Sequence, residues 1–212
     1  MPGKFVTFEG GEGAGKSTQI RRLAERLTAS GRQVTVTREP GGTPTAEAIR
    51  RLILSGFAQP LGVEGEAVLF AAARADHVDR VIRPALAADR WVLCDRFTDS
   101  TRAYQGATGG ADEGLLSALE RVAVGRTKPD LTVILDVPPE IGLARAARRG
   151  GAEPDRFERD DLAMHEARRR AFLDIAAWEP GRCVAIDATQ PEDAVAEAVW
   201  QVVTARLLDQ AA

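Results

Sequence analysis

With 212 residues, 44% of them hydrophobic, the chain can bury one sizeable core, so we expect a single domain that spans residues 1–212. Its net charge of −3 and its aromatic content of 5% exclude the basic, aromatic-rich surface typical of proteins that bind nucleic acid. No apolar run reaches the roughly 18 residues of a membrane span, and we therefore expect a cytoplasmic protein without a membrane partner.

Five β-type runs alternate with helical patterns along the chain. The predicted strands cover residues 5–8, 33–37, 91–94, 131–137 and 183–186. The predicted helices include 45–54, 64–88, two helices between 98 and 124, and 139–149, 160–178 and 192–208. This alternation predicts an α/β fold with right-handed crossovers and a five-stranded parallel sheet flanked by helices. Ligands of such sheets bind beyond the carboxyl ends of the strands, so the residues that follow each strand are the candidates for a site.

A glycine-rich loop follows the first strand. Residues 10–17 read G-G-E-G-A-G-K-S, which matches G-x-x-x-x-G-K-[ST] in the strand–turn–helix context that this phosphate-binding motif needs. The backbone N–H groups of such a loop surround phosphate, Lys16 would reach the outer phosphates, and Ser17 would hold Mg²⁺ through its hydroxyl. The candidate nucleotide-binding residues here are Gly10, Gly11, Glu12, Gly13, Ala14, Gly15, Lys16, Ser17 and Thr18.

Charged residues follow the second and third strands. Arg38 and Glu39 precede Pro-Gly-Gly, which predicts a fixed turn. This turn would leave both side chains at the edge of the sheet where ligands bind. The alternative is an ordinary turn with both charges solvated. Asp95 and Arg96 end the third strand, where a carboxylate can anchor the hydration shell of Mg²⁺ and a guanidinium can clamp a phosphate. A salt pair at the end of a strand is the structural alternative.

Two further groups combine a candidate function with a simple structural alternative. Phe70 and Arg74 lie one helical turn apart, so they could stack on a planar base and donate to its carbonyl, or be a core Phe beside a surface Arg. Arginines bracket Gly150-Gly151, an arrangement that suits a closing lid as well as a basic helix end. They are Arg145, Arg148, Arg149 and Arg156.

The cysteines and histidines show no ligand or catalytic pattern. Cys94 and Cys183 lie in separate strand-like runs without C-x-x-C spacing, so we interpret them as small apolar core residues. His77 and His165 are isolated within helical patterns and are interpreted as ordinary surface or packing residues.

Taken together, these motifs resemble the thymidylate kinase family over nearly the whole chain. The resemblance rests on F-E-G-G-E-G-A-G-K-S-T, T-R-E-P-G-G-T, F-A-A-A-R, C-D-R-F-T-D-S-T-R-A-Y-Q-G, P-D-L-T and I-D-A-T-Q-P. It implies a P-loop nucleoside monophosphate kinase fold with a lid at about 145–157, commonly a homodimer. It also implies phosphorylation of dTMP to dTDP with ATP and Mg²⁺.

The resemblance further implies roles for individual residues. Residues 10–18 and Gln190 would bind ATP, with Ser17 and Asp95 at the metal. Lys16, Arg96 and a lid arginine, Arg149 or Arg156, would be catalytic. The residues implied for dTMP are Glu12, Arg38, Glu39, Arg50, Phe70, Arg74, Arg96, Thr101, Tyr104 and Gln105. Among these, Phe70 would stack on thymine and Tyr104 would crowd the 2′ position. Phe97 stands where the family often has Tyr or His, and Glu12 instead of a P-loop arginine resembles the bacterial branch.

Two other functions fit parts of the sequence. A kinase for another nucleotide or nucleoside would share the P-loop and lid without needing Phe70, Arg74, Thr101 and Gln105 together. A GTPase switch is suggested by T-K-P-D at residues 127–130, which matches a loose [NT]-K-x-D guanine motif. That motif precedes the fourth strand, however, whereas a guanine-binding motif follows a strand. The chain also lacks D-x-x-G after residue 94.

Overall fold

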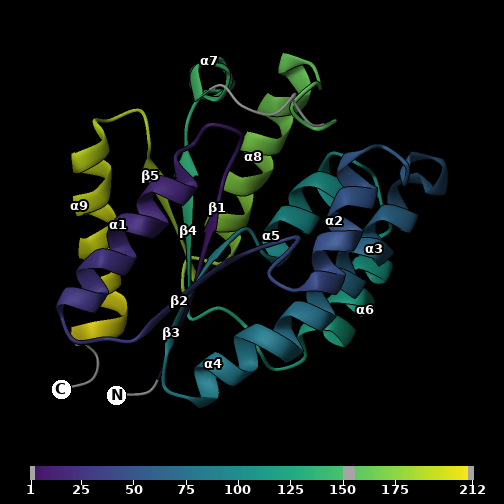
Figure 1. Cartoon of the computed structure of the whole chain (residues 1–212). Helices are drawn as coiled ribbons and strands as arrows, with labels where there is room; N and C mark the ends of the chain where they lie inside the picture. Colours follow the sequence, from purple (N-terminus) through teal and green to yellow (C-terminus); the bar gives the residue numbers. More distant parts are fainter. Residues whose placement is uncertain (1–2, 150–155, 210–212) are drawn as a thin grey trace.

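A computed structural model describes residues 3–149 and 156–209, with the side chain of Arg149 outside the described part. Five strands form one parallel sheet in the order β2-β3-β1-β4-β5 (Figure 1). Their bounds are β1 Phe5–Glu9, β2 Val34–Arg38, β3 Trp91–Asp95, β4 Leu131–Asp136 and β5 Cys183–Asp187. The predicted parallel sheet is confirmed, and the order brings the ends of β1 and β3, with the residues that follow them, side by side.

The strand ends differ slightly from the predicted ones. The first, second, third and fifth strands continue one residue beyond the apolar run, so Glu9, Arg38, Asp95 and Asp187 are still paired in the sheet. Val137, predicted as the end of the fourth strand, lies just beyond it. Apolar patterning ends before backbone pairing does, because the last side chains face the polar edge of the sheet.

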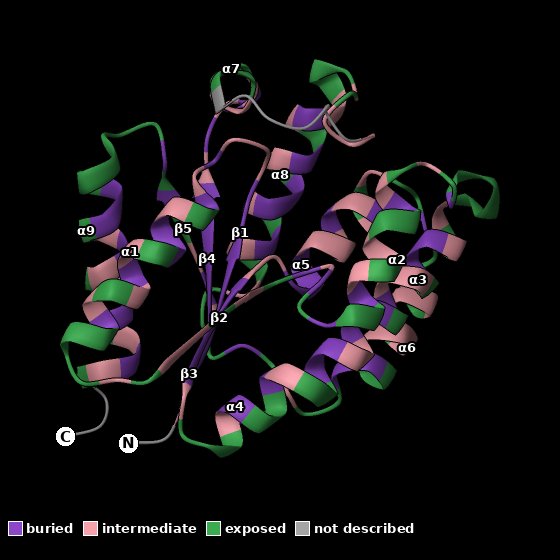
Figure 2. Ribbon diagram, viewed as in Figure 1, coloured by how far each residue is buried: buried purple, intermediate pink, exposed green. Residues whose placement is uncertain are grey.

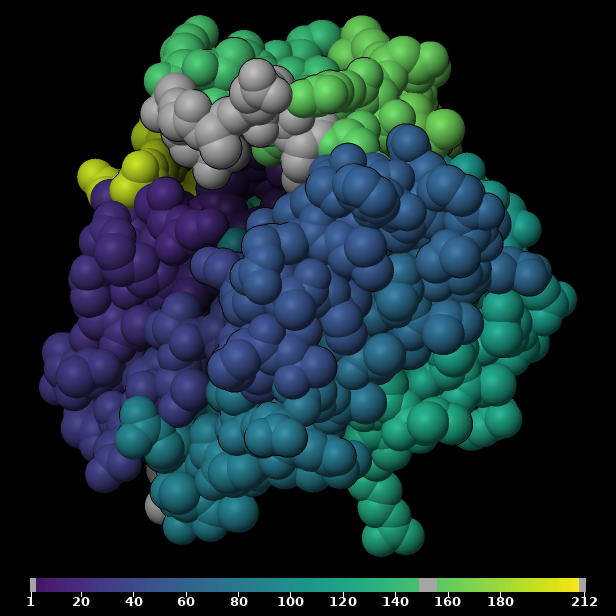
Figure 3. Space-filling view, turned by 45° about the vertical axis from the view of Figure 1, so that its right-hand side comes forward, coloured from purple at the N-terminus to yellow at the C-terminus, as the bar shows by residue number. Residues whose placement is uncertain are grey.

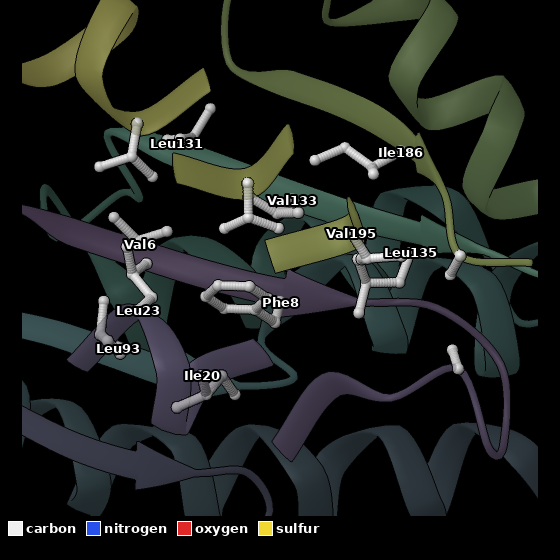
Figure 4. Close-up of a cluster of buried hydrophobic side chains, with 14 of the residues drawn as sticks. Val6, Phe8, Ile20, Leu23, Leu93, Leu131, Val133, Leu135, Ile186 and Val195 are labelled. Atoms are coloured by element: carbon white, nitrogen blue, oxygen red, sulfur yellow. The ribbon is translucent and has the colours of Figure 1, made fainter. Parts of the chain in front are cut away.

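Two helices cover one face of the sheet. α1 (Lys16–Ala29) and α9 (Glu192–Val203), which continues into the π-helical turn η4 (Thr204–Leu208), pack against the inward-facing side chains of β1, β3 and β4. Figure 4 shows Ile20 and Leu23 of α1 and Val195 of α9 around Phe8 of β1. The 3–4-residue spacing of Ile20, Leu23 and Leu27 gives α1 this buried stripe and fixes its N-terminus at the end of β1.

The other face is covered by most of the helices between β2 and β5. They are α3 (Gly62–His77), α4 (Arg83–Ala87), α5 (Thr98–Thr101) with η3 (Arg102–Ala107), α6 (Glu113–Val124) and α8 (Leu162–Trp178). α2 (Pro44–Leu54) and η1 (Gln59–Leu61) pack on α3. α7 (Pro139–Arg149) follows β4 and lies above the edge where the strands end (Figure 1). Figure 2 shows β1, β3 and β4 almost entirely buried between these layers, whereas the edge strands β2 and β5 are partly exposed.

The helical stretch predicted over residues 64–88 is confirmed, and it contains a π-helical turn. α3 ends at His77, the π-helical turn η2 (Val78–Ile82) follows, and α4 carries Pro84 as its second residue. Proline has no N–H to donate back into the helix, and the wider turn before it accommodates that loss. The wider turn begins directly after His77, which lies at the end of α3 against the loop that follows β2.

Both cysteines are buried and free, as predicted. Both histidines are buried as well, which confirms the packing interpretation and corrects the surface one. Among the described residues, no helix has the length and apolar character needed to cross a membrane.

Candidate functional site

The carboxyl ends of the strands open onto a cavity of about 580 Å³. Figure 3 shows the molecule hollowed between the purple N-terminal part and the blue region of α2 and α3. Most of the predicted site residues line this cavity, namely Glu12, Gly13, Ala14, Gly15, Lys16, Ser17, Thr18, Arg38, Glu39, Arg50, Phe70, Arg74, Asp95, Arg96, Thr101, Tyr104, Gln105 and Gln190. One continuous space therefore contacts both the P-loop and the Phe70–Arg74 helix.

The P-loop holds its lysine inside the loop. The Lys16 ammonium donates to the carbonyl oxygens of Gly10 and Gly11 at 3.1 and 2.9 Å, so these two glycines support the lysine from behind the cavity wall. Burial and the positive charge of Arg96 lower the pKa of Lys16. Removal of water and the proximity of two cations make this end of the cavity favourable for polyanions.

The P-loop packs directly on α7. A Cβ atom on Gly13, whose φ is +66°, would lie 1.9 Å from the carbonyl oxygen of Gly142, and a Cβ on Gly142 would lie 2.3 Å from the carbonyl oxygen of Glu12. Neither position has room for a side chain. The shape of the loop therefore depends on a glycine in α7 that the motif does not include.

Ser17 and Asp95 meet as predicted. The Ser17 hydroxyl donates to Asp95 Oδ2 at 2.9 Å, which joins the first turn of α1 to the end of β3. A hydroxyl and one carboxylate, both oxygen donors, are the protein ligands that Mg²⁺ takes when substrate phosphates and water complete its shell. The two residues fit this ion.

Glu12, Arg96 and Tyr104 form a charged cluster at the middle of the cavity. Arg96 forms an ion pair with Glu12, and the Tyr104 hydroxyl donates to Glu12 Oε1 at 3.3 Å. Burial alone would raise the pKa of Glu12, but the charges of Arg96 and Lys16 outweigh it and lower that pKa to about 2. Burial raises the pKa of Tyr104 to about 12, so its hydroxyl keeps its proton at neutral pH. The cluster is thus an ionised carboxylate held by a guanidinium and a phenol.

The backbone turn that carries Arg96 is held in place by hydrogen bonds to Glu9. Its φ is +68°, in the left-handed region that L-residues rarely adopt. Glu9, fully buried at the end of β1, accepts hydrogen bonds from Phe97 N at 2.7 Å and from Ser100 Oγ at 2.6 Å. Burial, followed by the charge of Asp99, raises the pKa of Glu9 to about 7. Glu9 therefore fixes the turn that aims Arg96 into the cavity, a role that the sequence analysis did not assign.

Glu39 and Arg74 form a buried pair. The Arg74 Nε donates to Glu39 Oε2 at 2.6 Å, and its Nη2 donates to the carbonyl oxygen of Phe97 at 3.0 Å and to Thr101 Oγ1 at 3.1 Å. His77 contacts the other oxygen of Glu39 at 2.9 Å. The alternative of solvated turn charges is wrong for Glu39, which is 4% exposed.

Aromatic rings gather beside this pair. Phe157 lies 6.5 Å from Phe70 and 5.5 Å from Tyr104, measured between ring centroids. The guanidinium of Arg168, in α8, lies 4.5 Å from the centroid of the Tyr104 ring, and Gln105 is buried nearby in the cavity wall. A planar apolar ligand fits such a wall. The sequence analysis missed Phe157 and Arg168, because their approach depends on how α8 packs against η3.

Arg38 and Arg50 line the cavity near the loop that follows β2. Arg38 forms an ion pair with Glu47 at 2.8 Å, and its side chain is largely exposed. Its contacts in the structure therefore agree with the alternative of a solvated charge in a turn. Arg50 donates to the carbonyl oxygen of Pro40 at 3.0 Å. At the other end, Gln190 donates to Asp187 Oδ2 at 3.0 Å, in the loop after β5.

The predicted lid arginines are separated. Arg145 lines the cavity and donates to the carbonyl oxygen of Ala188 at 2.8 Å. Arg156 pairs with Glu66 of α3, with 2.6 Å between Nη2 and Oε2, and does not line the cavity. The side chain of Arg149 and residues 150–155 lie outside the described part of the chain. The catalytic roles of Arg149 and Arg156 stay predictions.

The T-K-P-D segment lies at the opposite end of the sheet. Asp130 accepts a hydrogen bond from Phe5 N at 2.8 Å and pairs with Lys4, where β1 begins. It therefore holds the entry to β1 and is remote from the P-loop, which removes the support for a guanine site.

Comparisons with known proteins agree with the geometry. A family model described as thymidylate kinase matches residues 8–199. A thymidylate kinase from Bradyrhizobium diazoefficiens is 59% identical over 207 residues, which cover 97% of this chain and 91% of that protein. One from Rhodopseudomonas palustris strain BisB18 is 61% identical over 208 residues, with coverages of 97% and 90%. The crystal structure of thymidylate kinase from Ehrlichia chaffeensis is similar with a TM-score of 0.76 and 35% identity, covering 96% of this chain and 99% of that one.

Proposed function

The chain belongs to the thymidylate kinase family and phosphorylates dTMP to dTDP with ATP, and from this premise we propose roles for the residues of its cavity. The observation that carries the proposal is that one cavity contacts both the P-loop and the Phe70–Arg74 helix. ATP binds at the first and dTMP at the second, so that their phosphates meet near Arg96.

On the ATP side, residues 10–18 bind the phosphates and Gln190 borders the adenine. Ser17 and Asp95, 2.9 Å apart, hold Mg²⁺ together with the phosphates. Mg²⁺ held there would supply positive charge that offsets the charge of the ATP phosphates. Lys16, already inside the loop, exchanges its carbonyl contacts for the outer phosphates.

On the dTMP side, the aromatic wall receives the base. Phe70 stacks on thymine, and Arg74, Thr101 and Gln105 address its polar edge. Tyr104 and Glu12 lie at the sugar, where the ring of Tyr104 excludes a 2′-hydroxyl and Glu12 faces the 3′-hydroxyl. The phosphate end is bound by Arg38, Arg50 and Arg96, with Glu39 supporting Arg74 from behind.

Phosphoryl transfer needs little from the protein besides alignment and positive charge. The nucleophile is a dTMP phosphate oxygen that is already ionised at neutral pH, so no general base is required. Lys16, Arg96 and a lid arginine, Arg149 or Arg156, stabilise the charge that develops during in-line transfer.

We also propose that residues 1–212 form one domain with a lid at about 145–157, that the protein acts in the cytoplasm, and that it forms a homodimer. The dimer is supported by exposed apolar side chains on the neighbouring helices α3 and α6, where Val68 is 46% and Val122 is 83% exposed. Burying such a patch against a second copy is favourable.

A panel of acceptors tests the assignment of the cavity. ATP-to-ADP turnover is measured with dTMP, dUMP, UMP, CMP, AMP and GMP offered separately, and we expect the highest kcat/KM with dTMP. Higher kcat/KM with another nucleotide would instead support the alternative of a kinase for that acceptor.

A further inference from the structure

His77 occupies a fully buried position between two polar partners. Its Nδ1 lies 2.9 Å from Glu39 Oε1, its Nε2 lies 2.7 Å from Thr37 Oγ1, and the side chain is 0% exposed. An ionised carboxylate can only accept hydrogen bonds, so Nδ1 carries the proton and donates to Glu39. The Thr37 hydroxyl then donates a hydrogen bond to Nε2. The ring therefore links α3 to both β2 and the loop that follows it.

His77 and Arg74 hold the same carboxylate from the same helix. They are three residues apart in α3, which puts them on one face, and each contacts a different oxygen of Glu39. Rotation of the Glu39 carboxylate would break at least one of these contacts. Glu39 is thereby fixed in one orientation.

The ring of His77 is confined as well. A Cβ atom on Gly42 would lie 2.6 Å from His77 Cδ2 and 2.8 Å from Thr37 Oγ1, so the backbone after β2 packs on the ring without a gap. Packing limits movement of the ring, and the hydrogen bonds to Glu39 and Thr37 select the flip in which Nδ1 faces the carboxylate. The contact with Glu39 is consequently a fixed feature of this wall.

The fixed carboxylate determines where Arg74 points. Within the described part of the chain, the hydrogen bonds of Arg74 use Nε, toward Glu39, and Nη2, toward the carbonyl oxygen of Phe97 and Thr101. The guanidinium is planar, so fixing Nε and Nη2 also fixes the direction of the two Nη1 donors. Those donors remain for a ligand in the cavity that Arg74 lines.

We propose that His77 is a positioning residue for recognition of the base: it holds Glu39, and Glu39 orients Arg74 toward the carbonyl at position 4 of thymine. The inference rests on the proposed role of Arg74 in contacting the polar edge of thymine. His77 itself does not line the cavity. Its effect is therefore expected in substrate binding and base preference, not in the chemical step.

The test compares His77→Gln with His77→Asn. The Asn amide nitrogen can take the place of Nδ1 and keep the donor to Glu39, whereas the Gln amide reaches the place of Nε2 and loses that donor. We expect His77→Gln to raise the KM for dTMP about tenfold, the size of one hydrogen bond to a charged group. The kcat and the KM for ATP should stay within about threefold. His77→Asn should stay within about threefold of wild type in every parameter.

Base preference gives a second readout. The probe is 5-methyl-dCMP, which keeps the methyl group of dTMP and replaces the carbonyl at position 4 by an amine that cannot accept from Arg74. The ratio of kcat/KM for dTMP to that for 5-methyl-dCMP should fall about tenfold in His77→Gln and stay near wild type in His77→Asn. Loss of packing alone would lower both values together and leave the ratio unchanged.

Combining each change with Arg74→Ala separates this inference from the function on which it rests. If Arg74→Ala leaves the KM and the preference for dTMP unchanged, the proposed role of Arg74 is wrong, and the inference is wrong with it. If Arg74→Ala impairs binding while His77→Gln has no effect, or acts equally in both backgrounds, the inference alone is wrong. Should His77→Gln not fold, Glu39→Gln replaces it, and the same rise in the KM for dTMP and the same fall in the preference over 5-methyl-dCMP are expected.

Discussion

Glu12 and Arg96 form an ion pair that joins the P-loop to the turn after β3. The residue proposed to clamp the acceptor phosphate is therefore held by a carboxylate of the ATP-binding loop. Because the Tyr104 hydroxyl also donates to Glu12, the three groups proposed for donor, acceptor and sugar share one cluster. A change in any one of them should affect the others.

Lys16→Ala and Arg96→Ala should each lower kcat/KM by about 100-fold or more, which corresponds to about 2.7 kcal/mol of transition-state stabilisation. Each removes positive charge from the place where the phosphates meet. Steady-state kinetics measures the loss, and circular dichroism checks the fold. Arg21→Ala is the matched control, because Arg21 lies on α1 and forms an exposed pair with Glu25. Near wild-type turnover in either variant would refute the role assigned to that residue.

Tyr104→Ala should relax discrimination against ribo-TMP, because a smaller side chain no longer excludes a 2′-hydroxyl. Tyr104→Phe keeps the ring and removes the hydroxyl that donates to Glu12 at 3.3 Å, so it should keep the discrimination. The measurement is the ratio of kcat/KM for dTMP and ribo-TMP in both variants. An unchanged ratio in Tyr104→Ala would show that the ring is not the steric gate.

Glu9→Gln should change how stability depends on pH. The pKa of Glu9 is raised from 4.5 to about 7, so the folded state keeps a proton that the unfolded state releases between these values. The resulting stabilisation is complete below the lower value and is lost as pH rises through the higher one. The free energy of unfolding of wild type relative to Glu9→Gln should thus fall by up to about 3 kcal/mol between pH 4.5 and 8. Urea unfolding at several pH values measures it, and a constant difference would contradict the assignment.

Gly142→Ala should weaken ATP binding, because its Cβ would lie 2.3 Å from the carbonyl oxygen of Glu12 and must displace the P-loop. We expect the KM for ATP to rise about tenfold or more, the effect of misplacing several phosphate contacts. Gly181→Ala is the control, since a Cβ there meets nothing within 4 Å. If the two variants bind ATP equally well, the contact between the loop and α7 does not shape the nucleotide site.

Val122→Glu should dissociate the proposed homodimer by putting a charge into an apolar interface. Light scattering after gel filtration should then give the mass of one chain instead of two. Trp178→Glu changes an equally exposed apolar residue on α8 and should leave the mass unchanged. A wild-type protein that already has the mass of one chain would refute the dimer.

The sequence predicted those parts of the fold and site that depend on local order along the chain. Apolar runs predicted the five strands. The spacing of the P-loop motif predicted Lys16 and Ser17 as site residues. Asp95 was predicted because residues at the carboxyl ends of parallel strands lie at one edge of the sheet, where ligands bind. The structure brings Ser17 and Asp95 into contact at this edge, while their role at the metal stays a prediction. The helical stretch over 64–88 was predicted as well, but its π-helical turn was not, since the residues keep a helical pattern through that turn.

Other parts depend on packing between distant segments and left no local signal. Glu9 belongs to a strand by pattern, yet its carboxylate anchors the turn after β3. His77 is an isolated histidine in sequence and acquires its partners only when α3 packs against β2. Phe157 likewise contacts Phe70 and Tyr104, which are distant from it in the sequence. Such roles follow from geometry that no spacing rule encodes.

The left-handed backbone of Arg96 is a local strain that the side chain of the same residue compensates. A glycine would adopt φ near +68° without the steric cost of about 1 kcal/mol that an L-residue bears there. Arg96→Gly should therefore relax the turn while removing the guanidinium from the cavity. The same change would leave the Glu12 carboxylate without its ion-pair partner, and that loss outweighs the strain that a glycine would relieve. Thermal robustness and turnover therefore both favour keeping the guanidinium on this unfavourable backbone.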